Sequence, residues 1–165
     1  QRIVCNGLAR NHLCFGNIVW HKSRAVRNDG IRTDNAFCLP LCVQHCREPL
    51  LQLDEYLVEA LHSKGFYIAV ETNGTQTPPE GIDWITVSPK ARAELIIASG
   101  DELKLVYPQD EANPERFNDL NFSHFFLQPM DGPDIQVNTQ LVLEYCKENT
   151  NWRAGIQAHK YWGIP

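Results

Sequence analysis

The apolar side chains of this chain follow a regular pattern only after residue 48. In residues 49–64 they recur at spacings of three and four, the period of a helix with one buried face. Shorter apolar runs follow, and each ends at a polar or turn-forming motif, as buried strands do. The predicted elements are helices at 49–64 and 138–149, strands at 66–70, 84–87, 102–107, 124–127 and 152–157, and a short helix or turn within 111–120.

Buried strands with helices among them predict an α/β fold with a largely parallel sheet. Some connections are too short for a helix, so we expect a partial (βα) barrel. Parallel strands end at one edge of a sheet, and polar motifs at those ends are typical of a binding site. The motifs are Arg47-Glu48-Pro49, Glu71-Thr72-Asn73-Gly74-Thr75, Ser88-Pro89-Lys90, Gln128-Pro129-Met130-Asp131-Gly132 and Gln157-Ala158-His159-Lys160.

The first 46 residues have no consistent helical or strand period. Within them, residues 24–35 hold three Arg, two Asp and two Asn, which favours loop or disorder. We therefore divide the chain into an irregular segment, 1–46, and an α/β segment, 47–165, whose first strands are missing or garbled. A sheet that begins near Glu48 would have an unpaired edge and an uncovered apolar face, which predicts poor solubility or a homodimer.

Composition and charge indicate which classes of binding partner to expect. The 165 residues suffice for one domain with a real core, and the net charge of -5 argues against binding nucleic acid through its phosphates. No apolar run reaches the roughly 20 residues of a membrane helix, and the start has no secretory signal pattern. We expect a cytoplasmic protein that binds a small molecule, not a membrane or nucleic acid. A chain without an initial Met is expected to be a fragment or a processed product.

Together, the motifs from Glu48 to Pro165 resemble 7-carboxy-7-deazaguanine synthase, a radical S-adenosylmethionine enzyme. The resemblance rests on the order and spacing of several short motifs. They are Glu48-Pro49-Leu50-Leu51-Gln52-Leu53-Asp54, Ala69-Val70-Glu71-Thr72-Asn73-Gly74-Thr75, Ile82-Asp83-Trp84, Val87-Ser88-Pro89-Lys90, Glu102-Leu103-Lys104-Leu105-Val106, Leu127-Gln128-Pro129-Met130-Asp131-Gly132-Pro133 and Gln157 to Pro165.

The resemblance implies a partial (βα) barrel of the radical S-adenosylmethionine type, with a [4Fe-4S] cluster, S-adenosylmethionine and Mg2+ as cofactors. In the family, the reduced cluster cleaves S-adenosylmethionine. The resulting radical abstracts hydrogen from 6-carboxy-5,6,7,8-tetrahydropterin, whose ring contracts with loss of ammonia. The product is the 7-deazapurine precursor of queuosine, a modified tRNA base.

The resemblance assigns cofactor-binding roles to three strand ends. Glu48 would receive the ammonium of S-adenosylmethionine through charge-assisted hydrogen bonds. Ser88, Pro89 and Lys90 resemble a second cofactor-binding end, and Gln128, Pro129, Met130 and Asp131 the adenosine-side loop. Each of the three ends has a structural alternative: Glu48 as a surface residue that opens a helix, Ser88-Pro89-Lys90 as a turn that only ends a strand, and Met130, taken alone, as a core residue.

The substrate-binding residues implied by the resemblance are Glu71, Asn73, His159 and Pro165, the last through its terminal carboxylate. His159 and the adjacent Lys160 would meet the substrate's carboxylate or ring. Asn73-Gly74 alone would indicate only a tight turn, a lone His is usually structural, and a chain end often frays.

Before Glu48 the chain departs from the family pattern. Cys46-Arg47 stands where the family has Gly-Gly, and His45 stands where it has a Thr that contacts substrate. Glycine lets backbone approach a cofactor, so Arg47 would block that approach or turn outward. At the other end, Ala158 replaces a Thr.

The cysteines also depart from the family. With no secretory signal, the six cysteines are expected to be thiols, metal ligands or core residues. We expect Cys146 to be a buried core residue. Radical S-adenosylmethionine enzymes hold their cluster with a motif that ends in C-x2-C, which this chain lacks. Cys38, Cys42 and Cys46 would lie about 13 Å apart in a strand, too far for one cluster. We therefore assign neither a metal ligand nor a catalytic residue.

One hypothesis explains these departures: residues 1–46 are read in a shifted frame, or are foreign sequence, and join a family segment at Glu48. The chain would then be a synthase by descent with impaired activity. Two alternatives are a non-catalytic remnant that retains ligand binding and, less favoured, a small cysteine-based metal-binding protein.

Overall fold

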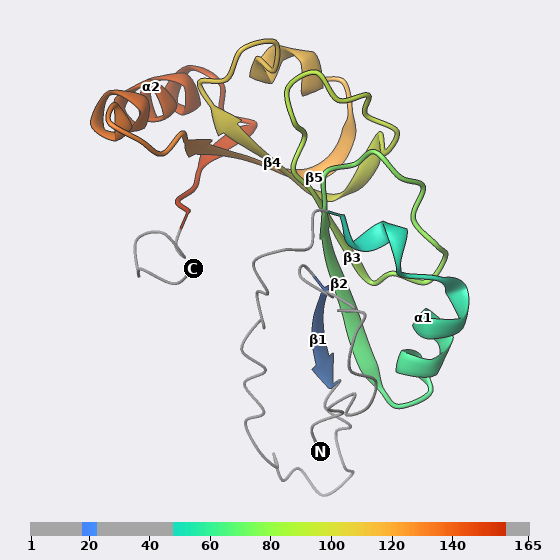
Figure 1. The fold of residues 1–165 in the computed structure, drawn as a ribbon. Coiled ribbons are helices and arrows are strands. Elements are labelled where there is room, and N and C mark those ends of the chain that lie inside the picture. The colour runs from blue at the N-terminus through green and yellow to red at the C-terminus, as the bar shows by residue number, and fades with distance from the viewer. Residues whose placement is uncertain (1–17, 23–47, 158–165) are drawn as a thin grey trace, which may run out of the picture.

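A computed structural model describes residues 18–22 and 48–157 of the chain. These residues form one sheet of six strands in chain order, in which β1 is antiparallel to β2 and the other strands are parallel (Figure 1). The strands are β1 (Ile18–Lys22), β2 (Phe66–Thr72), β3 (Trp84–Val87), β4 (Ser99–Tyr107), β5 (Asn121–Pro129) and β6 (Trp152–Ala154). The helices are η1 (Pro49–Leu51), α1 (Glu55–His62), η2 (Pro114–Phe117) and α2 (Ile135–Glu148), of which η1 and η2 are 3-10 helices.

The core lies on one face of this sheet. Alternate residues of the parallel strands are fully buried there, because side chains one residue apart point to opposite faces. Helix α1 packs against β2, and α2 packs against β5 and β6. Figure 1 shows the sheet arching, with both helices outside the arch. The largest fully buried side chains of the strands are Ile68, Val70, Val87, Leu103, Leu105, Leu127 and Trp152.

The α/β fold class and the mainly parallel sheet are confirmed, and the architecture is compatible with a partial (βα) barrel. The strand predicted at 84–87 has the bounds of β3. The helix predicted over 49–64 was too long at its start, since the structure has η1, a break, and then α1. The break has a physical cause: the Asp54 carboxylate accepts from Leu57 N at 2.8 Å and thereby caps a new helix.

Strand β1 corrects one expectation about the first 46 residues. It pairs with β2 over five residues, from Ile18 opposite Val70 to Lys22 opposite Phe66. The edge of β2 that was predicted to be unpaired is therefore covered. The division of the chain at residue 46 remains a prediction. No helix in the described part of the chain is long and apolar enough to cross a membrane.

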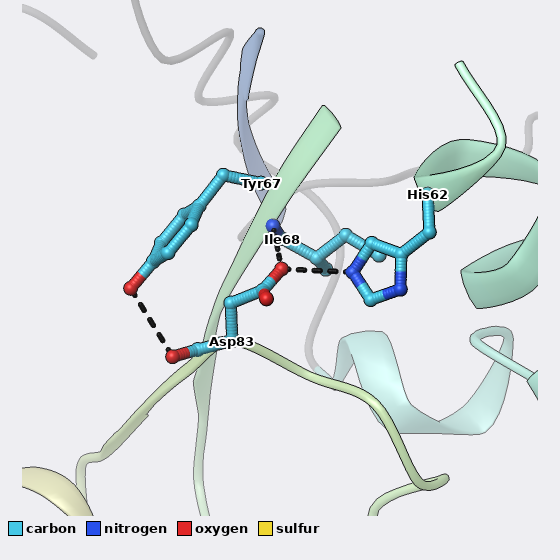
Figure 2. A network of polar contacts seen from close by, with 4 residues as sticks. All are labelled: His62, Tyr67, Ile68 and Asp83. Carbon is cyan, nitrogen blue, oxygen red and sulfur yellow. Dashed lines mark hydrogen bonds and ion pairs between the residues drawn. The ribbon is translucent and has the colours of Figure 1, made fainter. Parts of the chain in front are cut away.

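A polar network joins α1 to the starts of β2 and β3 (Figure 2). Asp83 Oδ2 accepts from Ile68 N at 2.7 Å and lies 2.9 Å from His62 Nε2. The Tyr67 hydroxyl donates to the Asp83 carbonyl at 3.1 Å. Burial raises the pKa of Asp83, but the bonds from Ile68 and His62 outweigh it and leave that pKa below its ordinary value. The carboxylate thus stabilises the sheet at the end opposite the predicted site.

Candidate functional site

The buried carboxylate of Glu48, the residue that caps η1, joins the start of η1 to the carboxyl end of β2. Its Oε1 accepts from Leu50 N at 3.0 Å and from Thr72 Oγ1 at 2.7 Å, and its Oε2 accepts from Asn73 N at 2.9 Å. The residue is 4% exposed. A carboxylate offers about four acceptor positions. Described residues fill three of these positions, and the fourth, on Oε2, has no partner among them.

Ser88 contacts Thr72, which also binds Glu48, because β3 pairs with β2. Its backbone N donates to Thr72 O at 2.7 Å, and its side chain is buried. Pro89 is also buried, whereas Lys90 is exposed and places Nζ 3.5 Å from Ser88 Oγ. Two predicted cofactor-binding ends therefore meet around Thr72.

The turn after β2 requires a glycine. Gly74 has a φ of +80°, and a Cβ there would lie 2.4 Å from Leu95 Cδ1. The Asn73 side chain takes part in the turn, since its Oδ1 accepts from Thr75 N at 2.9 Å. Asn73-Gly74 thus forms a tight turn, and Asn73 contacts Glu48 through its backbone rather than its side chain.

The third predicted group lies at the carboxyl end of β5. Gln128 Nε2 donates to Ile156 O at 3.1 Å, Pro129 is buried opposite Tyr107, and Asp131 is exposed. Met130 is 37% exposed. Strand β4 separates this group from Ser88, so two strand spacings, about 10 Å, lie between them. The group shares the edge of the sheet with Glu48 and Ser88 without joining their cluster.

A hollow of about 390 Å³ opens beside Met130. Its walls come from the carboxyl end of β4 and the loop that follows, and include Tyr107, Gln109, Asp110 and Asn113. The Met130 backbone is fixed at both ends: its N donates to Tyr107 O at 2.8 Å, and its O accepts from Asn138 Nδ2 at 2.9 Å. An exposed thioether on a fixed backbone is suited to contact a flat apolar ring.

A second group of polar residues lies on the face of the sheet opposite the buried core, which we call the open face. A row crosses four strands in register there: Glu71, Thr86, Glu102 and His124. Lys104, on the same face of β4, places Nζ 2.7 Å from Glu71 Oε1. The predicted pocket residue Glu71 is thus ion-paired.

The rings and the second carboxylate of the open face are also constrained. Trp84 stacks on His124 with ring centroids 6.1 Å apart and donates Nε1 to Thr86 Oγ1 at 3.1 Å. His124 Nδ1 is buried with no partner among the described residues. Burial is the main cause of a raised pKa at Glu102, to which Glu71 adds, whereas Lys104 and His124 oppose it.

Of this cluster, Glu71 alone was predicted from the sequence to belong to the site, and four members were not: Lys104, Glu102, His124 and Thr86. The available signal was polar alternation within the predicted strands at 102–107 and 124–127. Alternation predicts the face on which a side chain lies, but it does not predict the register between strands. That register brings Glu71 and Lys104 together.

Two predicted substrate-binding residues, His159 and Pro165, lie outside the described residues, as do His45, Cys46, Arg47 and Ala158. The fit of the implied cofactors can be examined in the part that is described. Glu48 offers one acceptor position to an ammonium, which suits S-adenosylmethionine. No group of three His, Cys, Asp or Glu in residues 18–22 and 48–157 could hold a metal, and Cys146 is the single cysteine there. This part of the chain does not fit a [4Fe-4S] cluster or a protein-held Mg2+.

No family model matches the chain. Its sequence is nevertheless similar to that of curated 7-carboxy-7-deazaguanine synthases. The identity is 59% to the protein from Caulobacter vibrioides and 58% to that from Bordetella pertussis, in each case over 118 residues, 72% of this chain and 56% of the relative. For the protein from Nitratidesulfovibrio vulgaris it is 48% over 121 residues, with the same coverage of both chains. The chain therefore spans a little over half the length of these relatives.

The match of 118 residues has the length of the segment from Glu48 to Pro165. Five parallel strands with polar residues at their carboxyl ends are compatible with the fold that the resemblance implied. Over this segment, the chain is related to the 7-carboxy-7-deazaguanine synthases.

Proposed function

We propose that this chain carries the S-adenosylmethionine-binding and pterin-binding part of a 7-carboxy-7-deazaguanine synthase. The observation that carries the proposal is the high identity to curated synthases over 118 residues. The geometry supports it, because Glu48, Ser88 and Gln128 lie at one edge of the sheet. The reaction would be the ring contraction of 6-carboxy-5,6,7,8-tetrahydropterin with loss of ammonia, a carbon–nitrogen lyase reaction.

Each residue has a role in this proposal that its surroundings support. Glu48 would accept one N–H of the cofactor ammonium at Oε2, the oxygen that also accepts from Asn73 N. Ser88 would orient the cofactor through its hydroxyl. Met130 would pack on the adenine at the hollow beside it, and Glu71 would face the pterin. When bound, S-adenosylmethionine supplies the radical that starts the family's reaction.

A second function is favoured by a different observation. The full sequence has no C-x2-C pair of the kind that ends the family's cluster motif. A chain without this motif would bind S-adenosylmethionine or the pterin without cleaving either. For a small cysteine-based metal-binding protein, the ligands would be Cys38, Cys42 and Cys46, which lie outside the described residues.

Anaerobic reconstitution with iron and sulfide separates these functions. A visible iron–sulfur absorbance together with cleavage of S-adenosylmethionine would support the synthase. Ligand binding by calorimetry without a cluster would support the non-catalytic function. Tight zinc binding that is lost when Cys38, Cys42 and Cys46 are replaced by Ser would support the third. Absence of both cluster and ligand binding would refute the proposal.

A further inference from the structure

Lys104 lies between two carboxylates on the open face of the sheet. Its Nζ is 2.7 Å from Glu71 Oε1, on the far side of β3, and its neighbour on the same face of β4 is Glu102. The Lys104 side chain is 20% exposed, whereas that of Glu71 is 43% exposed. The ammonium is therefore the more deeply held partner, and the carboxylate lies nearer to the surface of the site.

The contact is formed through one oxygen of Glu71. Oε2 has no hydrogen bond to any residue that the structure describes. Thr86 pairs with Glu71 and with Glu102 in the register, and its Oγ1 accepts from Trp84 Nε1. A carboxylate held at one oxygen presents the other oxygen in a defined direction, because the ion pair restricts its rotation.

Stability alone does not account for this arrangement. A half-exposed ion pair contributes about 0–1 kcal/mol to folding. Together with Lys104, the row has two carboxylates against one lysine, with His124 as its remaining ionisable group, while Arg153 lies on the same face at β6. Active sites commonly retain such unbalanced clusters because the charges orient a ligand.

We propose that Lys104 is a positioning residue: it holds Glu71 in one rotamer, so that Oε2 is aimed at an N–H donor of the pterin. This inference rests on the proposed function, which it deepens by naming what sets the direction of a predicted substrate-binding group. Lys104 acts through Glu71 and does not itself touch the ligand. A reduced pterin fits, because its amino and ring N–H groups match a lone carboxylate oxygen.

The inference has a readout in the absence of ligand. Three-bond coupling constants measured by NMR report the χ1 rotamer of Glu71. The full chain should show one fixed rotamer, Lys104→Gln should show rotamer averaging, and Lys104→Arg should restore the fixed state. Lys64→Gln, which removes an exposed lysine beyond α1, is the control and should leave the rotamer unchanged.

The titration of Glu102 provides a second ligand-free measurement. Lys104 lowers the pKa of this carboxyl and Glu71 raises it, while burial and His124 act in both variants alike. Lys104→Gln should therefore raise the pKa of Glu102, and Glu71→Gln should lower it. Opposite shifts would place the three side chains in one cluster, and an unchanged titration in both variants would overturn the proposal.

Binding completes the experiment, with 6-carboxypterin as the fluorescent probe. Lys104→Gln should weaken binding about tenfold, the effect of losing one charge-assisted bond of about 1.5 kcal/mol. Lys104→Arg should recover most of the loss, and Lys64→Gln should bind as the unmodified chain does. If the unmodified chain does not bind the probe, the proposed function fails, and the rotamer and titration data decide the inference by themselves. Equal binding and an equal Glu71 rotamer in Lys104→Gln would overturn it.

Discussion

At the scale of single residues, the hydroxyl of Thr72 links two parts of the site. It donates to Glu48 Oε1 at 2.7 Å and accepts from Gly74 N at 3.0 Å, and the residue is 2% exposed. Thr72→Val keeps the shape but leaves the buried carboxylate and the glycine N–H without this partner. We predict that the free energy of unfolding falls by about 1–3 kcal/mol, measured by urea denaturation. Thr77→Val, at an exposed position, is the matched control, and an equal loss in both variants would contradict the role of Thr72.

Glu48 itself allows a test of ligand binding. Glu48→Gln removes the negative charge and replaces one acceptor oxygen by an NH2 group, which would face donors. We expect the affinity for S-adenosylmethionine to fall at least about tenfold by calorimetry, since the bond to its ammonium is charge-assisted. Glu94→Gln, at an exposed position, provides the control. Equal affinities of the two variants would exclude Glu48 as the ammonium acceptor.

At the scale of secondary-structure elements, the two helices differ at their starts. Asp54 caps α1 through Leu57 N, whereas Asp134 at the start of α2 makes no side-chain capping bond. We predict that Asp54→Ala lowers the free energy of unfolding by about 1 kcal/mol. Asp134→Ala should cost less, since it removes only a charge near the helix start. Equal melting temperatures of the two variants would show that the cap does not stabilise α1.

The network around Asp83 predicts a pH dependence. Its folded-state pKa lies below the unfolded value of about 3.9. The carboxylate therefore stabilises the fold at pH values above the unfolded pKa, and this stability is lost as the pH falls through the folded pKa. Asp83→Asn should lower the free energy of unfolding at pH 7 by about 1 kcal/mol, and the difference should vanish in strong acid. Asp119→Asn, at an exposed position, should show no such convergence.

The sequence predicted these elements unevenly. The bounds of β3 follow from four apolar or β-branched residues between turn signals, so local information was sufficient. Strand β1 was missed, because its pairing partner lies more than forty residues away and its sequence alone has no strong period. The same limit applies to the site. A local motif such as Ser88-Pro89-Lys90 predicts where one strand ends. The Glu71–Lys104 pair, in contrast, depends on the register of three strands.

At the scale of the whole molecule, residues 1–46 differ in origin, we infer, from the rest of the chain. We propose that they are read in a shifted frame or derive from foreign sequence, because the similarity to the synthases extends over only 72% of the chain. Sequencing the source DNA around the codon for Arg47 tests this. An alternative frame that encodes a cysteine loop and Gly-Gly-Glu-Pro is the expected result. If no such frame exists, the proposal is wrong.

The oligomeric state belongs to the same scale. The homodimer remains a prediction. One reason for it no longer holds, because β1 pairs with the edge of β2 that was expected to be unpaired. Apolar side chains exposed on α2 still favour self-association, among them Val137 at 60% and Leu143 at 42% exposed. Light scattering should give twice the mass of the chain. A monomer that unfolds cooperatively at high protein concentration would contradict the dimer.

The donors that the structure describes leave one acceptor position on Glu48, and this number limits how the site can hold an ammonium. A primary ammonium has three N–H donors, and this carboxylate can receive one of them. The other two need acceptors supplied from elsewhere. Dimethylation of the ligand's amine leaves one N–H donor. It should therefore lower the affinity only if the chain supplies those further acceptors. Comparing the affinities of two such ligands would show, without a structure of the complex, whether this chain supplies acceptors for the other two N–H donors.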